Sequence, residues 1–172
     1  QDTASQDTLS EIPPEWFISL CSPRGPLEID TGDIDYRRGV DLALACREAR
    51  YVESWTDRSL GALEATLQVT LQWALEEVGG LLVHASAGVY QNEGWLIPGV
   101  SGAGKSTAAR EGGFDTILSD ELVIVRPSLS SHKSSAAYRL YSTPFWSEGR
   151  SAPLIVSDAP LSAITFPHKA GV

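Results

Sequence analysis

The chain has 172 residues, of which 42% are apolar, enough for one globular domain with a sizeable core. Its formal net charge of −9 argues against partners such as nucleic acid or an anionic membrane surface. No apolar run is long enough to span a bilayer and no signal peptide opens the sequence, so we expect a cytoplasmic protein.

The few cysteines and the lack of methionine bear on the compartment and on the processing of the chain. Cys21 and Cys46 are the two cysteines, and they do not have the spacing of a metal site. This favours a reducing compartment, although a disulfide between them stays open. The absence of methionine predicts a processed chain or a fragment.

The N-terminal part predicts a lead-in and several extended segments. Residues 1–14 are polar and end in two prolines, so we expect a disordered lead-in. Residues 15–20 predict a strand, and residues 27–35 predict a hairpin. Residues 40–52 fit either a helix or strands, and residues 47–53 favour a strand.

Residues 60–78 carry the clearest helical pattern. Either Asp57 or Ser59 can cap the start, and two glycines at 79–80 can end the helix. Apolar side chains recur with helical spacing and predict one buried stripe: Leu60, Leu63, Leu67, Leu71, Leu75 and Val78.

Short apolar segments separated by turns predict strands in the second half of the chain. These segments are residues 81–84, 87–90, 95–97, 114–118, 122–125, 138–141 and 161–166. Residues 91–94 predict a hairpin turn, and Gly112 limits the length of a helix that follows residue 104. Residues 128–136 predict a mobile serine-rich loop, and residues 143–146 predict a turn with exposed aromatic side chains.

Residues 99–107, GVSGAGKST, match the P-loop pattern without a mismatch. Glycines let successive N–H groups turn inward around a phosphate, and the helix after the loop aims its positive end at the same anion. Lys105 adds a charge on the β- and γ-phosphates, and Ser106 offers a hydroxyl to Mg²⁺. The residues expected to bind the nucleotide are Gly99, Ser101, Gly102, Ala103, Gly104, Lys105, Ser106 and Thr107.

Two acids after the loop are candidates for the remaining chemistry. Asp120 closes a predicted strand, where a kinase needs a carboxylate on the metal or its water. Glu121 follows it, and adjacent residues of an extended segment face opposite ways, so the two acids should have different roles. Arg139 and Arg150 flank residues 143–146, and each fits either the transferred phosphoryl group or the surface.

The order of motifs over residues 81–125 resembles the kinase core of HPr kinase/phosphorylase and its related serine kinases. The shared features are a His that opens a strand, a hairpin, the P-loop, and a strand that ends in two acids. Residues 142–148 and 160–166 are also similar to that family. The resemblance implies that Asp120 binds the metal with Ser106. It also implies that an acid of the pair, Asp120 or Glu121, accepts the proton of the attacking hydroxyl with help from His84.

The sequence therefore predicts one α/β domain over residues 15–172, with accessory elements over 15–80 and a nucleotide-binding core over 81–172. The resemblance implies a mixed, partly antiparallel sheet of the phosphoenolpyruvate-carboxykinase-like kind. The expected activity is Mg²⁺-dependent phosphoryl transfer from ATP, another nucleotide or pyrophosphate. The acceptor would be a hydroxyl, either serine of a protein or peptide or a small molecule. The alternative is an inactive nucleotide-binding regulatory or scaffold module, and self-association stays open.

Overall fold

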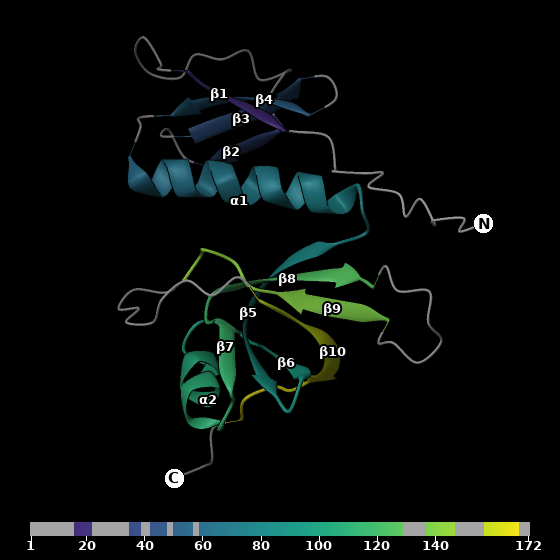
Figure 1. The fold of residues 1–172 in the computed structure, drawn as a ribbon. Coiled ribbons are helices and arrows are strands. Elements are labelled where there is room, and N and C mark those ends of the chain that lie inside the picture. The colour runs from purple at the N-terminus through teal and green to yellow at the C-terminus, as the bar shows by residue number, and fades with distance from the viewer. Residues whose placement is uncertain are drawn as a thin grey trace, which may run out of the picture. The chain divides into compact units, whose positions relative to one another are not determined.

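The computed structural model describes residues 16–21, 35–38, 42–47, 50–56, 59–128, 137–146 and 157–168. These residues form ten strands and two helices in two compact units, Gln1–Thr70 and Leu71–Val172 (Figure 1). The predicted lead-in over residues 1–14 lies outside the described residues. So do most of the hairpin predicted over 27–35 and most of the serine-rich loop.

The first unit contains a sheet of four strands in the order β1–β4–β3–β2. Their bounds are β1 Phe17–Cys21, β2 Tyr36–Arg38, β3 Leu42–Arg47 and β4 Tyr51–Thr56. Strand β1 runs parallel to β4, and the other two pairs are antiparallel. Of residues 40–52, which fit a helix or strands, the described ones are in strands β3 and β4 and in a turn at Arg50, where φ is 73°.

Helix α1 spans Leu60–Glu76, so it begins where predicted and ends two residues before the predicted end at 78. The hydroxyl of Ser59 accepts a hydrogen bond from the amide of Ala62 at 3.2 Å, which satisfies one unpaired N–H of the first turn. After the last turn, Gly79 has a φ of 67° and the amide of Gly80 donates to the carbonyl of Leu75 at 2.7 Å. A positive φ at this position is what a glycine C-cap provides.

The buried face of α1 differs from the predicted leucine stripe over the part of the helix in the first unit, whereas Leu75 in the second unit is buried as predicted. Within the first unit, Leu60 is 85% exposed and Leu67 is 44% exposed, whereas Ala62 and Thr66 are fully buried. The Thr66 hydroxyl lies 2.9 Å from that of Ser54 on β4 and also donates to the Ala62 carbonyl. The buried hydroxyls of Ser54 and Thr66 need hydrogen-bond partners, and each supplies one to the other. In the first unit this face is therefore buried in place of Leu60, Leu63 and Leu67.

The second unit contains a sheet of six strands and helix α2. Their bounds are β5 Leu81–Tyr90, β6 Glu93–Pro98, α2 Lys105–Glu111, β7 Thr116–Ser119, β8 Leu122–Pro127, β9 Tyr138–Tyr141 and β10 Asp158–Ile164. The order is β6–β10–β9–β8–β5–β7, and an additional pairing of β6 with β5 closes five of the strands into a ring. Within the ring only β6 and β10 are parallel.

The α/β fold predicted from the sequence, including its phosphoenolpyruvate-carboxykinase-like arrangement, is wrong. The described residues are mainly strands and include two helices, and five strands of the second unit close on themselves. An α/β sheet stays open and is covered by helices on its faces. Here the interior of the ring is filled by side chains of its own strands and of β7: Ala85, Ala87, Leu96, Leu118, Val123 and Leu140. Because the strands close into a ring, these side chains are buried against one another without a covering layer of helices.

The β5–β6 hairpin supplies the strand that leads into the P-loop, and its turn is local in origin. Gln91 and Asn92 both have positive φ, 50° and 66°, as a two-residue primed turn requires. The amide of Gln91 donates to a carboxylate oxygen of Asp115 at 2.8 Å. The register pairs Tyr90 with Glu93 and Ala85 with Pro98. The far end of β6 therefore lies beside the middle of β5.

Candidate functional site

The phosphate loop, defined here as residues 99–104, joins β6 to α2 and has glycine at three positions where another residue would be strained or crowded. Gly102 and Gly104 have φ values of 74° and 96°, which an L-residue adopts only with strain. At Gly99 the reason is space, because a Cβ would lie 3.2 Å from Cβ of Ala103. The amide of Ala103 donates to the Val100 carbonyl at 3.1 Å. Left-handed residues in such a turn point N–H groups to one side, which forms an anion-binding concavity.

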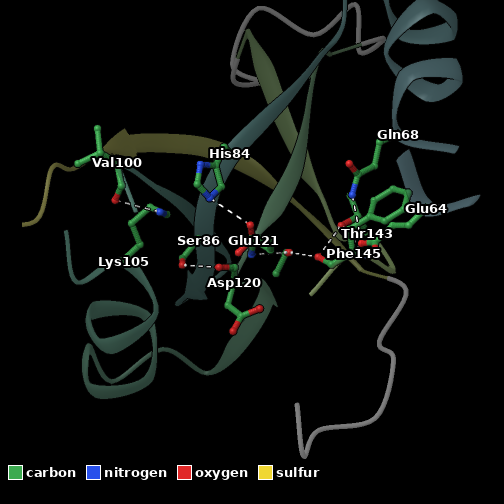
Figure 2. A network of polar contacts seen from close by, with 11 residues as sticks. Glu64, Gln68, His84, Ser86, Val100, Lys105, Asp120, Glu121, Thr143 and Phe145 are labelled. Carbon is green, nitrogen blue, oxygen red and sulfur yellow. Dashed lines mark hydrogen bonds and ion pairs between the residues drawn. The ribbon is translucent and has the colours of Figure 1, made fainter. Parts of the chain in front are cut away.

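Lys105 is the first residue of α2 and is 6% exposed. Its ammonium donates to the carbonyl of Val100 at 3.3 Å, so the side chain folds back over the phosphate loop (Figure 2). An ammonium has three N–H donors, and this is its one hydrogen bond among the described residues. Ser106 is half-buried, and Ser101 and Thr107 are exposed. A buried cation above a glycine-rich turn suits an anionic ligand.

Asp120 and Glu121 form the acidic turn that links β7 to β8, and their side chains have different surroundings. Asp120 is buried, with Oδ2 at 3.5 Å from a guanidinium nitrogen of Arg110 on α2. Glu121 is half-exposed, and its Oε1 lies 3.2 Å from Nε2 of His84 on β5. The Asp120 carboxylate points away from the His84–Glu121 pair (Figure 2). The prediction that neighbouring acids face different ways therefore describes the turn correctly.

Strand β5 connects the phosphate loop with the acidic turn. Ala85 is paired with Pro98, the residue before the loop, and its amide donates to the Glu121 carbonyl at 3.0 Å. The next residue, Ser86, donates its buried hydroxyl to the Asp120 carbonyl at 3.3 Å. Helix α2, which begins with Lys105, contacts β5 and β6. The residues predicted from separate motifs therefore gather around one stretch of one strand.

Several residues of the site were not predicted from the sequence. Arg110 carried a weak signal, because it lies on the helix that follows the phosphate loop. Ser86 follows His84 by two positions on β5, and such residues share a face of a strand. Ser119 and Thr143, whose hydroxyls hold the acidic turn, gave no signal, because the bonds that join them to other segments, to Phe145 and Leu122, span more than 20 residues of sequence.

Two other expectations change with the structure. Residues 143–146 do not expose their aromatic side chains: Phe145 is 7% exposed, and the indole N–H of Trp146 donates to the Thr143 carbonyl at 2.9 Å. Arg139 pairs with Asp158 on β10, with Nε 2.6 Å from Oδ2, so this arginine has a carboxylate partner on the neighbouring strand. Arg150 lies outside the described residues.

Ser106 and Asp120, the residues predicted to bind magnesium, carry oxygen groups of the kind that this ion prefers. In the described parts of the chain, no three or more His, Cys, Asp or Glu side chains group together as metal ligands. Mg²⁺ does not need such a group, because it is usually held by one or two carboxylates, substrate phosphates and water. The buried Asp120 carboxylate and the Ser106 hydroxyl supply that type of oxygen ligand.

Comparisons with known proteins do not assign the chain to a family. No protein-family model matches the chain, and no curated protein matches it significantly.

Among the described residues, no helix has the length and apolarity needed to cross a membrane.

Proposed function

We propose that the protein binds a nucleoside triphosphate at the phosphate loop and, with Mg²⁺, transfers its terminal phosphoryl group to a hydroxyl. The observation that carries the proposal is the loop itself. Two left-handed glycines turn the backbone beside a buried lysine, and strand β5 ties this loop to an acidic turn. Phosphoryl transfer needs phosphate positioning, charge neutralisation and a proton acceptor, and the site offers a residue type for each.

Each side chain has a role that follows from its surroundings. Lys105, whose ammonium now donates to the Val100 carbonyl, would direct its remaining N–H donors to phosphate oxygens. Ser106 and Asp120 would hold Mg²⁺, which neutralises charge on the phosphates when bound. The Arg110 guanidinium beside Asp120 would have to share that carboxylate with the metal. This competition should weaken metal binding in the absence of nucleotide.

The His84–Glu121 pair would receive the proton of the acceptor. As the acceptor oxygen forms its bond to phosphorus and the bond to the leaving phosphate oxygen breaks, the hydroxyl proton passes to the Glu121 carboxylate. His84 lies at hydrogen-bond distance from that carboxylate and would orient it. Both side chains are nearly half exposed, so a hydroxyl on a protein, peptide or small molecule has access to them. The resemblance of the motif order to that of HPr kinase-related enzymes suggests serine as that hydroxyl.

A nucleotide donor and the free thiol of Cys21 both fit a reducing compartment rich in nucleotides, so we propose that the protein acts in the cytoplasm.

Two observations favour a second function, that of a nucleotide-binding module without turnover. Arg110 already engages the carboxylate that the metal would need, and Lys105 already donates to its own loop. A module of this kind would bind nucleotide as a signal and leave the phosphoryl group in place. The two functions differ in whether phosphate leaves the bound nucleotide.

Calorimetric titration with ATP, ADP and pyrophosphate, each with and without Mg²⁺, tests the binding step. Asp120→Asn should abolish the gain in affinity from Mg²⁺, while Glu111→Gln, which removes an exposed carboxylate from α2, should keep it. Incubation with labelled ATP and serine-containing peptides then tests transfer. Transfer that Glu121→Gln abolishes without loss of binding supports the enzyme. No binding by the folded wild-type protein refutes both functions.

A further inference from the structure

We propose that the hydroxyls of Ser119 and Thr143, named here the hydroxyl clasp, are positioning groups that hold the acidic turn in the form that binds metal. The inference rests on the proposed function, and it adds two residues to the machinery of that site. Neither side chain reaches the ligand. Each acts through the backbone of the acidic turn.

The clasp bonds the peptide groups on either side of the acidic turn. Ser119 precedes Asp120, and its hydroxyl accepts a hydrogen bond from the amide of Glu121 at 3.3 Å. Thr143, beyond the end of β9, donates its hydroxyl to the carbonyl of Leu122, which directly follows the turn. The turn is therefore fixed on both sides by side chains from two different segments.

The two hydroxyls are joined through Phe145, which makes the clasp one unit. Ser119 donates its hydroxyl proton to the Phe145 carbonyl at 3.1 Å, and the Phe145 amide donates to the Thr143 hydroxyl at 3.3 Å. The Trp146 indole bonds the Thr143 carbonyl and closes the segment on itself. Figure 2 shows Thr143 and Phe145 on the segment that meets the acidic turn.

Because both hydroxyls of the clasp are buried, the loss of either one should disturb the acidic turn. Ser119 is fully buried and Thr143 is 2% exposed, so water cannot readily replace a missing hydroxyl. Without its partner, the Glu121 amide or the Leu122 carbonyl would have to find another one, and the turn would shift to do so. Ser86 holds the same turn from the opposite side, through the Asp120 carbonyl. The turn can therefore move only by breaking several buried bonds together.

The test compares hydroxyl removals of nearly constant shape in the full chain. Thr143→Val and Ser119→Ala should each weaken binding of ATP with Mg²⁺ by about three- to tenfold, the size of one lost hydrogen bond. Binding of ATP without Mg²⁺ should not change, because the phosphate loop is intact. Thr143→Ser retains the hydroxyl and should restore the gain from Mg²⁺. Thr66→Val removes an equally buried hydroxyl from the first unit and is the matched control.

Hydrogen exchange of the Glu121 amide, followed by NMR, gives a second readout that needs no ligand. Exchange should accelerate in Ser119→Ala and Thr143→Val but not in Thr66→Val. Unchanged exchange in both clasp variants overturns the clasp, whatever the ligand data show. If the wild type gains affinity from Mg²⁺ and both variants keep that gain, or if Thr66→Val loses as much, the positioning role is refuted. A wild type that does not bind ATP refutes the proposed function, and the metal-positioning role with it.

Discussion

Replacement of Gly102 by alanine separates the loop conformation from the stability of the fold. Gly102 has a φ of 74°, and a Cβ added there would meet no atom within 4 Å. The substitution therefore introduces backbone strain of about 1–2 kcal/mol without a steric clash. An exposed loop can relieve that strain in the free protein by rotating to negative φ. Phosphate binding must then restore the left-handed conformation, so the affinity for ATP with Mg²⁺ should fall by about 5- to 30-fold.

Gly113 provides the matched control for this experiment. It also has a positive φ, 71°, with no atom within 4 Å of an added Cβ, but it follows the other end of α2. Gly113→Ala should lower the free energy of unfolding by about 1–2 kcal/mol, the size of the backbone strain, and should leave the affinity for ATP unchanged. Calorimetric titration gives the affinities, and denaturant unfolding gives the stabilities. Wild-type affinity in folded Gly102→Ala, or an equal loss in both variants, would refute the assigned role of the loop.

Three further predictions test the site and the packing. Lys105→Met should abolish nucleotide binding by calorimetry, while the unfolding free energy stays within about 1 kcal/mol, because a buried cation with one hydrogen bond adds little stability. Gly88→Ala should destabilise the protein by about 1–3 kcal/mol in denaturant unfolding, since its Cβ would lie 2.4 Å from Cγ of Phe114. In a Phe114→Ala background, which lacks the clashing atoms, Gly88→Ala should cost less. Leu67→Gln should lower the free energy of unfolding by less than about 1 kcal/mol in the same assay, and Ala62→Leu should lower it by about 1–3 kcal/mol. A larger loss for Leu67→Gln than for Ala62→Leu would mean that the leucine face is the buried one.

The features that the sequence predicted correctly depend on residues close together in the chain. Ser59 at the start of α1 and Gly79 after its end act on the nearest turn of the helix. The hairpin turn at Gln91 and Asn92 and the left-handed Gly102 are likewise set by local backbone geometry. Such preferences are stereochemical, so they can be recognised before the fold is known.

The face that α1 buries in the first unit could not be predicted in this way. The leucine stripe has the larger apolar area, and area alone favours its burial. The structure buries Ala62 and Thr66, because Thr66 finds a hydroxyl partner on Ser54 of the sheet. That partner lies twelve residues away on another element, and no periodicity within the helix reports its presence.

The sequence by itself determined the glycine-rich loop, its lysine and the positions of the acids and of His84. Only the tertiary structure decided that five strands close into a ring instead of forming an open, helix-covered sheet. It also decided that His84 meets Glu121, and that Thr143 holds the acidic turn from 21 residues away. The reason is physical. A turn is selected by the steric limits of its own few residues, whereas strand pairing and buried hydrogen bonds are selected by competition among distant segments for the same partners.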